Sequence, residues 1–395
     1  MIYLFILFVA AITQPGYGAT VDPMVVSDSM TNVPIGRHSA LYVDDSGTMT
    51  FDQVRAAALA GDFEPSTIDS PKFGFTDASI WSKITLENPS SSPLVAFLES
   101  KYQLLDYITL YMPTPEGYQQ QRVGDRVSAK DKIVRHRRHV LKLEVPPGVS
   151  TWYIKTSSQG SLNLPYYLWG AEPFVQNSEN EYQIVGLIYG FLAVMFAYNI
   201  FLTISFRSIT YLAYCGYIIF FIGYAMGFLG SALEVFDDAM AQYMSNEGLL
   251  LNIQLTTLFG CIFAYFFFDI KDRSKKAKVF FALLIGFAVL ISVVSQIVPY
   301  NTAAKLVNLY AGIHAITIII YGTARSIKGY RPAIYYTIAF LCLMAGNLSL
   351  VLSVGGIIPV GLIATWGNSV GACMEVVLLS LALGDRVNFI RNAQE

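Results

Sequence analysis

The stretch that decides the fold reads LLLNIQLTTLFGCIFAYFFF at residues 249–268, DIKDRSKKAK at 269–278 and VFFALLIGFAVLISVVSQIV at 279–298. Two apolar blocks therefore flank one short basic loop. Because a helix rises 1.5 Å per residue, about 20 apolar residues match the ~30 Å hydrocarbon core of a bilayer. This stretch predicts two membrane-crossing helices that are joined on one side of the membrane.

The same alternation of apolar block and polar loop extends outward over residues 183–384. Lipid cannot satisfy exposed backbone polar groups, so apolar blocks in a membrane must form helices or closed barrels. These blocks are too long and too uniformly apolar for barrel strands. We therefore expect an α-helical seven-transmembrane bundle. The spans are expected at residues 183–205, 209–230, 249–268, 279–298, 303–324, 333–356 and 360–384.

Loop charges predict the orientation of these helices. Arginine and lysine gather in every second connection, at Arg207, in residues 271–278, in residues 325–331 and after the seventh span. The connections on the other side are acidic or uncharged, apart from Lys305 near the start of the fifth span. By the positive-inside rule the basic side is cytoplasmic. We therefore expect the N-terminal region outside the membrane and the C-terminus inside.

Composition agrees with a membrane protein that has a soluble part. Of the 395 residues, 54% are hydrophobic and 14% are charged, which excludes a single globular domain of ordinary composition. The net charge of -2 gives no indication of a nucleic-acid partner, and none is expected. The four cysteines all fall within predicted spans, so no disulfide framework or zinc spacing is present. We expect neither a cofactor nor a bound metal.

The first 33 residues are expected to lie outside the folded domain. Residues 1–18 carry an apolar run, with Gly16 and Gly18 at the positions that a signal peptidase reads, so we interpret them as a cleaved signal peptide. An uncleaved anchor is the alternative, and it would add an eighth crossing. Residues 19–33 lack periodicity and are expected to form a flexible leader.

Residues 34–172 are expected to form one domain, which shows the period-two alternation of β-strands from Trp81 onward. Thr50 and Gln53 resemble a capping box that opens a short helix reaching about Ala60. Short strands separated by turn residues are typical of an antiparallel sandwich or jelly roll. We expect strands at residues 81–88, 94–100, 105–112, 118–123, 139–145, 151–157 and 162–169. The expected fold class is a multidomain membrane protein, an all-β jelly-roll or sandwich domain followed by the helical bundle, with a linker at residues 173–182.

Several short phrases occur in a recognisable order along the chain. In the β region they are residues 44–47 (DDSG), 50–54, 80–81, 86–89 (LENP), 123–126 (VGDR), Arg138, 146–148 (PPG) and 161–169. In the membrane region they are residues 189–190, 198–199, 211–212 and Glu375 with 379–386. This order resembles the bacterial seven-transmembrane receptors with diverse intracellular signalling modules (7TMR-DISM), with an extracellular jelly roll of the second type (7TMR-DISMED2). One departure is Lys132, where the family pattern suggests an arginine.

The resemblance implies a receptor for a periplasmic small molecule or glycan, because this jelly roll is similar to carbohydrate-binding modules. The seven helices would pass the state of that domain inward, as a homodimer in the lipid bilayer of the inner (cytoplasmic) membrane. Such receptors usually continue into a coiled coil and a catalytic output domain, whereas this sequence stops at Glu395. We therefore expect residues 385–395 to be a signalling-helix stub. The output module, of diguanylate cyclase or histidine kinase type, would be supplied in cis by a longer chain or in trans by another protein.

Aromatic and basic side chains of the β region are candidates for ligand contact. Aromatic rings can stack on a sugar, and arginine can bind an anionic group. The alternative is that aromatic residues of half-buried strands belong to the core, and that the basic run at residues 135–139 is a solvated loop. The candidates are Trp81, Tyr102, Arg126, Arg138, Trp152 and Tyr153.

Polar side chains of the membrane region are candidates for signalling. A carboxyl at membrane depth is costly, so Glu375 is either a switch between two states or a fixed bond that orients the seventh helix, with His314 as a candidate partner. Asparagine side chains are expected to hydrogen-bond between helices. Asp385 and Arg386 either set the phase of the last helix or form an ordinary interfacial ion pair. The candidates are Asn199, His314, Asn368, Glu375, Asp385 and Arg386.

No catalytic motif occurs in its required context, so we expect a protein without enzymatic activity. Residues 367–371 (GNSVG) match the G-x-S-x-G pattern of serine hydrolases, but that motif needs a strand-to-helix turn, and here it lies within an apolar helix. No P-loop or HExxH sequence occurs. The alternative function is a membrane transporter or channel with a periplasmic binding domain, although the spans show no duplicated halves with interrupted helices.

Overall fold

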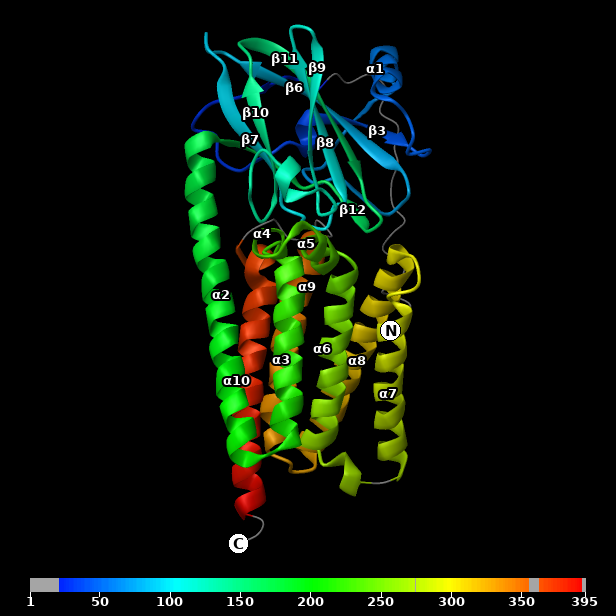
Figure 1. Cartoon of the computed structure of the whole chain (residues 1–395), viewed down its shortest axis with the longest axis vertical. Helices are drawn as coiled ribbons and strands as arrows, with labels where there is room; N and C mark the ends of the chain where they lie inside the picture. The colour runs from blue at the N-terminus through cyan, green and yellow to red at the C-terminus, as the bar shows by residue number, and fades with distance from the viewer. Residues whose placement is uncertain (1–20, 274, 355–361, 393–395) are drawn as a thin grey trace.

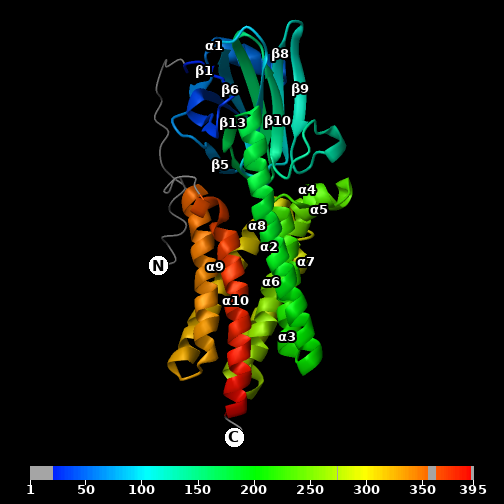
Figure 2. The ribbon, with the colours of Figure 1, turned by 90° about the vertical axis from the view of Figure 1, so that its left-hand side faces the viewer.

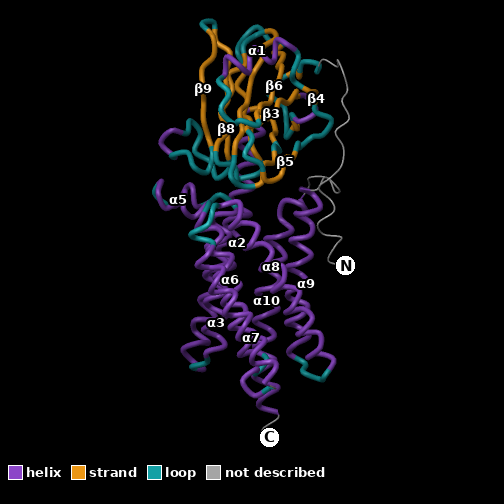
Figure 3. The backbone as a smooth tube through the Cα atoms, turned by 90° about the vertical axis from the view of Figure 1, so that its right-hand side faces the viewer, coloured by secondary structure: helices purple, strands orange, loops and turns teal. Residues whose placement is uncertain are grey.

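The computed structural model describes residues 21–273, 275–354 and 362–392, so the expected signal peptide at residues 1–18 lies outside the described residues. Strands occupy the N-terminal part of the chain and long helices the remainder, and the two parts stack end to end (Figure 1). Figure 3 shows the same division, with the strands gathered at one end of the molecule. The expected all-β domain followed by a helical bundle is confirmed.

The β domain is built from short strands between residues 24 and 170. Their bounds are β1 (Met24–Val25), β2 (Val33–Pro34), β3 (Ser39–Asp44), β4 (Glu64–Pro65), β5 (Lys72–Phe75), β6 (Ser79–Asn88), β7 (Leu94–Ser100), β8 (Tyr107–Thr114), β9 (Gly117–Val123), β10 (His139–Val145), β11 (Gly148–Ser157), β12 (Ser161–Asn163) and β13 (Tyr166–Gly170). One sheet has the order β4-β3-β6-β11-β8-β9, with β1 paired to β6 in parallel. A second has the order β10-β7-β13-β2, and β12 pairs with β5.

The two larger sheets pack face to face around one apolar core. Strand residues alternate between the two faces of a sheet, so every second side chain points inward. Leu86 of β6 and Ile154 of β11 belong to the same buried cluster as Leu98 of β7 and Leu141 of β10. Helix α1 (Phe51–Ala60) covers the outer face of the first sheet, and its expected capping box is confirmed.

Two expectations about the β region are corrected by the structure. Residues 162–169 form two strands rather than one, because Pro165 has no N–H with which to continue a ladder, and β12 and β13 then join different sheets. The expected flexible leader at residues 19–33 contains β1, and Met24 and Val26 are buried in the core.

Six helices within the described residues are long and apolar enough to cross a membrane. They are α2 (Ala171–Phe206), α3 (Ile209–Phe228), α6 (Glu247–Phe267), α7 (Lys275–Val294), α8 (Tyr300–Ile327) and α9 (Pro332–Val354). A further long helix, α10 (Leu362–Asn392), runs along the bundle beside α9 (Figure 2). Two short helices that the sequence did not predict, α4 (Ala232–Val235) and α5 (Asp238–Ser245), lie beneath the β domain.

The expected linker at residues 173–182 is instead the outer end of α2. This helix begins at Ala171, directly after β13. Pro173 lies in its first turn, where a backbone N–H has no helical partner, so proline is tolerated there. Phe174 then packs on Phe97 of β7 and Trp169 of β13. The β domain is therefore joined to the bundle by one continuous helix.

Helices α9 and α10 approach each other through glycine. A Cβ atom added at Gly346 would lie 2.3 Å from the carbonyl oxygen of Gly367, and one at Gly371 would lie 2.7 Å from that of Cys342. Small residues allow helix backbones to approach closely. The GNSVG motif thus serves helix packing, as its position within an apolar helix predicted.

Candidate functional site

Buried charges join the β domain to the outer end of α2. The Arg138 guanidinium donates to Glu99 of β7 at 3.0 Å and to Glu181 of α2 at 2.9 Å, and Arg137 donates to the other oxygen of Glu181. All four side chains belong to residues that are at most 8% exposed. Breaking a buried ion pair costs about 3–5 kcal/mol, because one charge is left without a partner. This network, Glu99–Arg138–Glu181–Arg137, therefore sets how α2 docks on the sandwich.

Local sequence places each member of the network. Glu99 lies near the end of β7, where its second carboxylate oxygen accepts from the Trp169 indole N–H at 2.9 Å. Arg138 directly precedes β10, the antiparallel neighbour of β7. Gly170 lets α2 start close to the N-terminal strand region, since a Cβ there would lie 1.9 Å from the carbonyl oxygen of Asp28.

One face of α2 is continuous from the sandwich into the bundle. Its buried residues recur at intervals of three, four and seven, which keeps them on one side of a helix. They are Phe174, Ser178, Glu181, Val185, Leu192 and Asn199. The same face therefore carries the charge network at its outer end and contacts the other helices further in.

Arg137 also contacts two other helices. Its guanidinium donates to the carbonyl oxygen of Leu229, at the outer end of α3, at 3.0 Å, and lies 5.8 Å from the Trp366 ring of α10. Gly230 has φ +79°, and a Cβ there would lie 2.0 Å from the carbonyl oxygen of Arg137. One buried guanidinium of the β domain thus touches α2, α3 and α10.

A second set of contacts joins the β domain to the loop between α3 and α6. Ser128 donates to the Asp238 carboxylate at 2.6 Å, and the backbone N–H of Ala129 donates to its other oxygen at 2.8 Å. Arg126 forms an ion pair with Glu247 of α6 at 2.9 Å. Asp125 directly precedes Arg126 in the sequence. Burial raises the pKa of Asp125 well above its usual value, and the nearby Asp106 carboxylate acts in the same direction.

Between these contacts lies a cavity of about 640 Å³. The β domain contributes basic side chains to it, including Lys132, Arg135 and His136. The facing segment, which contains α4 and α5, contributes acidic ones, including Glu234 and Asp238. Pockets for small molecules typically have volumes of about 300–1,000 Å³. The cavity is therefore of a size and polarity to hold a small polar ligand between the two domains.

The aromatic ligand candidates are dispersed through the β domain. Trp152 lies in the core between the sheets, where its indole N–H donates to Ser150 at 3.0 Å. Trp81 and Tyr153 pack with Phe51 beneath α1. Tyr102 is half-buried against the same core as Trp152. A ligand could stack on the buried rings only if these clusters opened.

The structure brings the two basic candidates, Arg126 and Arg138, to the same domain interface. The interpretation of residues 135–139 as a solvated loop is wrong for positions 136 to 139, which are all buried. What the sequence did not show is the acidic partner, because Glu181 lies in a segment that we expected to be a linker. The sequence signal for this buried charge network is the run of two arginines between two histidines at residues 136–139. Helical periodicity through residues 174–185 is a second signal, because it places Glu181 on the buried face of a helix.

Within the bundle, Glu375 of α10 is fully buried and bonded to α3. The Tyr217 hydroxyl donates to its Oε1 at 2.7 Å, and Oε2 has no hydrogen-bond partner among the described residues. The partner is thus a tyrosine, rather than the candidate His314. The His314 ring packs near Phe340, and its Nε2 has no partner in the described part of the chain.

Other polar side chains also join α10 to its neighbours. The Tyr214 hydroxyl of α3 donates to the carbonyl oxygen of Val376 at 2.7 Å. Asn368 donates to the Tyr224 hydroxyl at 3.4 Å. Asn199 of α2 donates within its own helix at 2.8 Å and reaches Ser380 of α10 at 3.5 Å.

At the far end of the bundle, α10 is held to α6. The Arg386 guanidinium donates to the carbonyl oxygens of Phe267 and Phe266 at 3.0 and 3.1 Å, and to the Asp269 carboxylate at 2.8 Å. These carbonyls lie at the end of α6, where that of Phe266 also accepts from the backbone N–H of Asp269 at 3.3 Å and that of Phe267 from the Tyr330 hydroxyl at 2.9 Å. Asp385 lies 3.8 Å from Arg331, so Asp385 and Arg386 pair with other segments rather than with each other.

Comparison with known families agrees with this architecture. Residues 181–386, more than half of the chain, match the family model described as 7TM diverse intracellular signalling. Residues 36–170 match the model described as 7TMR-DISM extracellular 2. No curated protein matches the chain. The chain therefore belongs to the 7TMR-DISM family, the multi-pass transmembrane sensory receptors with an extracellular domain in front of the helical bundle.

Proposed function

We propose that this receptor binds a small polar ligand at the domain interface and passes its state to α10. The observation that carries the proposal is the position of Arg137, whose buried guanidinium contacts Glu181 of α2, Leu229 of α3 and Trp366 of α10. A ligand that shifts residues 129–136 would also move Arg137, because Arg137 follows them directly in the sequence. The docking of three helices would then respond to one binding event.

The ligand class that we propose is a sugar or glycan fragment. Such molecules carry many hydroxyl groups, each of which both donates and accepts hydrogen bonds, and the interface cavity offers cationic donors on one wall and carboxylate acceptors on the other. Phe236 adds an aromatic ring to the lining. This wall composition supports a polar ligand over an apolar one.

The proposed setting is the bacterial inner membrane, with the β domain periplasmic and the C-terminus cytoplasmic. Cationic residues gather at the ends of the helices opposite the β domain, as the positive-inside rule requires. We propose that the receptor is a homodimer without enzymatic activity of its own. Its α10 would control an output module of diguanylate cyclase or histidine kinase type, in cis or in trans.

The test is a ligand screen on the full-length receptor in lipid nanodiscs. Thermal unfolding is followed with sugars, glycan fragments, small anions and divalent cations, since a one-site ligand at a hundred times its Kd adds ~2.7 kcal/mol of stability. For each hit, hydrogen exchange is measured at residues 128–139 and at residues 380–392. We expect one ligand class to raise Tm and to change exchange in both segments.

A matched pair of variants identifies the site. Lys132→Gln removes a cation from the cavity wall, whereas Lys142→Gln removes one from an exposed ion pair with Glu144 on β10. Ligand affinity should fall in the first variant and stay unchanged in the second. Equal affinity in both variants would place the ligand elsewhere, and a bound ligand without any exchange change in α10 would contradict the signalling role.

A further inference from the structure

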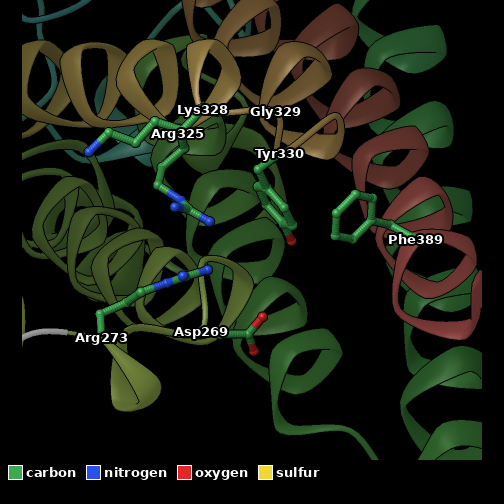
Figure 4. Close-up of a pocket in the computed structure, with 7 residues that line it drawn as sticks. All are labelled: Asp269, Arg273, Arg325, Lys328, Gly329, Tyr330 and Phe389. Atoms are coloured by element: carbon green, nitrogen blue, oxygen red, sulfur yellow. The ribbon is translucent and has the colours of Figure 1, made fainter. Parts of the chain in front are cut away.

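A second cavity, of about 240 Å³, lies at the end of the bundle opposite the β domain. The loop after α6 contributes Asp269 and Arg273, and α10 contributes Phe389. The end of α8 and the turn that follows contribute Arg325, Lys328 and Tyr330. Figure 4 shows that the guanidinium groups of Arg273 and Arg325 point toward one another across it.

The cavity has an excess of positive charge. Arg273, Arg325 and Lys328 are cations, and no ion pair involving any of them occurs in the described part of the chain. The single acid of the lining, Asp269, is already paired with Arg386 at 2.8 Å. The Arg325 Nε is buried and has no hydrogen-bond partner among the described residues. Cations that face one another across a cavity, without an ion-pair partner among the described residues, provide an arrangement that binds an anion.

We propose that this cavity binds a phosphate group, of the kind carried by an anionic phospholipid headgroup or by free inorganic phosphate. Arginine suits phosphate because its planar donors bond two oxygens at once. The cavity is smaller than the pockets of about 300–1,000 Å³ that enclose whole ligands, so it fits a headgroup with its remaining atoms outside. Ile327, which directly precedes the lining residue Lys328 in the sequence, is 81% exposed and offers an apolar side chain to an acyl chain.

The bound phosphate would act on α10 through contacts that already exist. Phe389 of α10 lies edge-on to Tyr330 at a centroid distance of 5.3 Å, and Arg386 of α10 holds Asp269. A phosphate that fixes Arg273 and Arg325 therefore orders the two segments against which the end of α10 packs. The receptor would then report the anionic content of its membrane in addition to any extracellular ligand, an inference that rests on the proposed cytoplasmic position of this end.

The experiment uses the full-length receptor, without extracellular ligand, in nanodiscs of phosphatidylcholine. Phosphatidylglycerol is added to the lipid in one arm, and inorganic phosphate to the buffer in the other. Binding is measured as the shift in Tm and, for the lipid, as the amount retained in native mass spectra. A response to phosphatidylglycerol alone assigns the headgroup as the source, and a response to inorganic phosphate alone assigns the free ion. Either response supports the site, and no response in both arms overturns it.

Charge-matched variants separate the cavity from general surface attraction. Arg273→Gln with Arg325→Gln should weaken binding about a hundredfold, since each of the two lost charge-assisted hydrogen bonds contributes about a factor of ten. Lys275→Gln with Lys276→Gln removes the same charge from neighbouring positions outside the lining and should leave binding within about twofold of the original, because exposed charges are screened. Equal weakening in both pairs would overturn the proposal.

A conservative variant keeps the test decisive if the glutamine pair unfolds. Arg325→Lys retains the charge but loses the planar donors, so it should bind phosphate more weakly than the original while keeping its Tm in neutral lipid. Unchanged affinity in Arg325→Lys would overturn the role of this guanidinium. These readouts involve no extracellular ligand, so this site can fail while the proposed sensing function stands, and the reverse.

Discussion

The Tyr217 hydroxyl of α3 and the Glu375 carboxylate of α10 share a 2.7 Å hydrogen bond in the interior of the bundle. The outer end of the same α3 meets Arg137 through the carbonyl oxygen of Leu229. The extracellular domain and α10 are therefore connected through one helix as well as by the direct approach of Arg137 to Trp366. A change in docking at the interface has a physical route to the carboxylate.

Tyr217→Phe should destabilise the bundle by about 1–2 kcal/mol, because it leaves the buried Glu375 carboxyl without its donor. Glu375→Gln keeps an acceptor for the tyrosine and should cost less. The matched control is Tyr198→Phe, at a half-exposed position of α2, which should change stability by less than about 0.5 kcal/mol. Unfolding in detergent measures all three variants, and equal effects of the two tyrosine changes would contradict this role for Tyr217.

Arg138→Met should destabilise the docked receptor by about 3–5 kcal/mol, because Glu99 and Glu181 would be left buried without their shared cation. Lys142→Met removes a cation from an exposed pair on the next strand and should cost less than about 1 kcal/mol. Urea unfolding gives both values. If the two changes cost the same, the network does not hold the domains together.

Gly230→Ala should destabilise the domain interface by more than the strain of placing alanine at a positive φ. A Cβ there would lie 2.0 Å from the Arg137 carbonyl oxygen, so the loop must move away. Gly61→Ala is the matched control, since Gly61 also has a positive φ, of +86°, but has nothing within 4 Å of the added atom. The control should cost about 1 kcal/mol. Hydrogen exchange at residues 136–139 should rise in the first variant and stay unchanged in the second.

Stability should fall as the solution becomes acidic, because two interface histidines are held neutral. Burial lowers the pKa of His139 to about 3, and Lys132 acts in the same direction. Burial, together with Arg137, lowers the pKa of His136 to about 3 as well. Below pH ~6.5 the unfolded chain binds protons that the folded chain does not. As the pH falls from ~6.5 to about 3, each histidine therefore lowers the free energy of unfolding by up to about 1.4 kcal/mol per pH unit. Above pH ~6.5 it has no such effect.

Asp125 contributes with the opposite sign. Its raised pKa means that the folded chain holds a proton which the unfolded chain loses above pH ~3.9, so its stabilisation is present in acid and is lost as the pH rises. The free energy of unfolding, measured between pH 7.5 and 4.5, should depend less steeply on pH in the double variant His136→Gln with His139→Gln, because both titrating imidazoles are gone. The acid loss should become steeper in Asp125→Asn. If the free energy of unfolding changes with pH at the same slope in the original receptor and in these variants, the two histidines and Asp125 are not the source of the pH dependence.

The membrane helices, most strands and the cap of α1 were predictable because each depends on residues close together in the sequence. Apolar length predicts a membrane span, and Thr50 with Gln53 predicts a helix start within one turn. The break between β12 and β13 at Pro165 also depends on residues close together in the sequence. The apolar residues on both sides of Pro165 nevertheless predict one continuous strand. For α2, the apolar block predicts a start at residue 183, whereas packing of Phe174 on Phe97 and Trp169 extends the helix back to Ala171.

The candidate site was less predictable because its partners are distant in sequence. Arg138 pairs with Glu99 and Glu181 across 39 and 43 positions, and Tyr217 with Glu375 across 158. One sequence contains no signal for such pairs before the fold is known. Composition identifies the polar residues of the bundle, whereas only the three-dimensional arrangement shows that tyrosines are the partners of Glu375 and Asn368.

The continuity of α2 has a mechanical consequence. Its 36 residues give a rigid rod of ~54 Å, anchored at the outer end by Glu181 and Phe174. A rod of that length works as a lever, in which a tilt of about 5° at the anchored end displaces the other end by about 5 Å. A flexible linker would absorb such a tilt, whereas a continuous helix would carry it as a displacement of its other end, at the opposite end of the bundle.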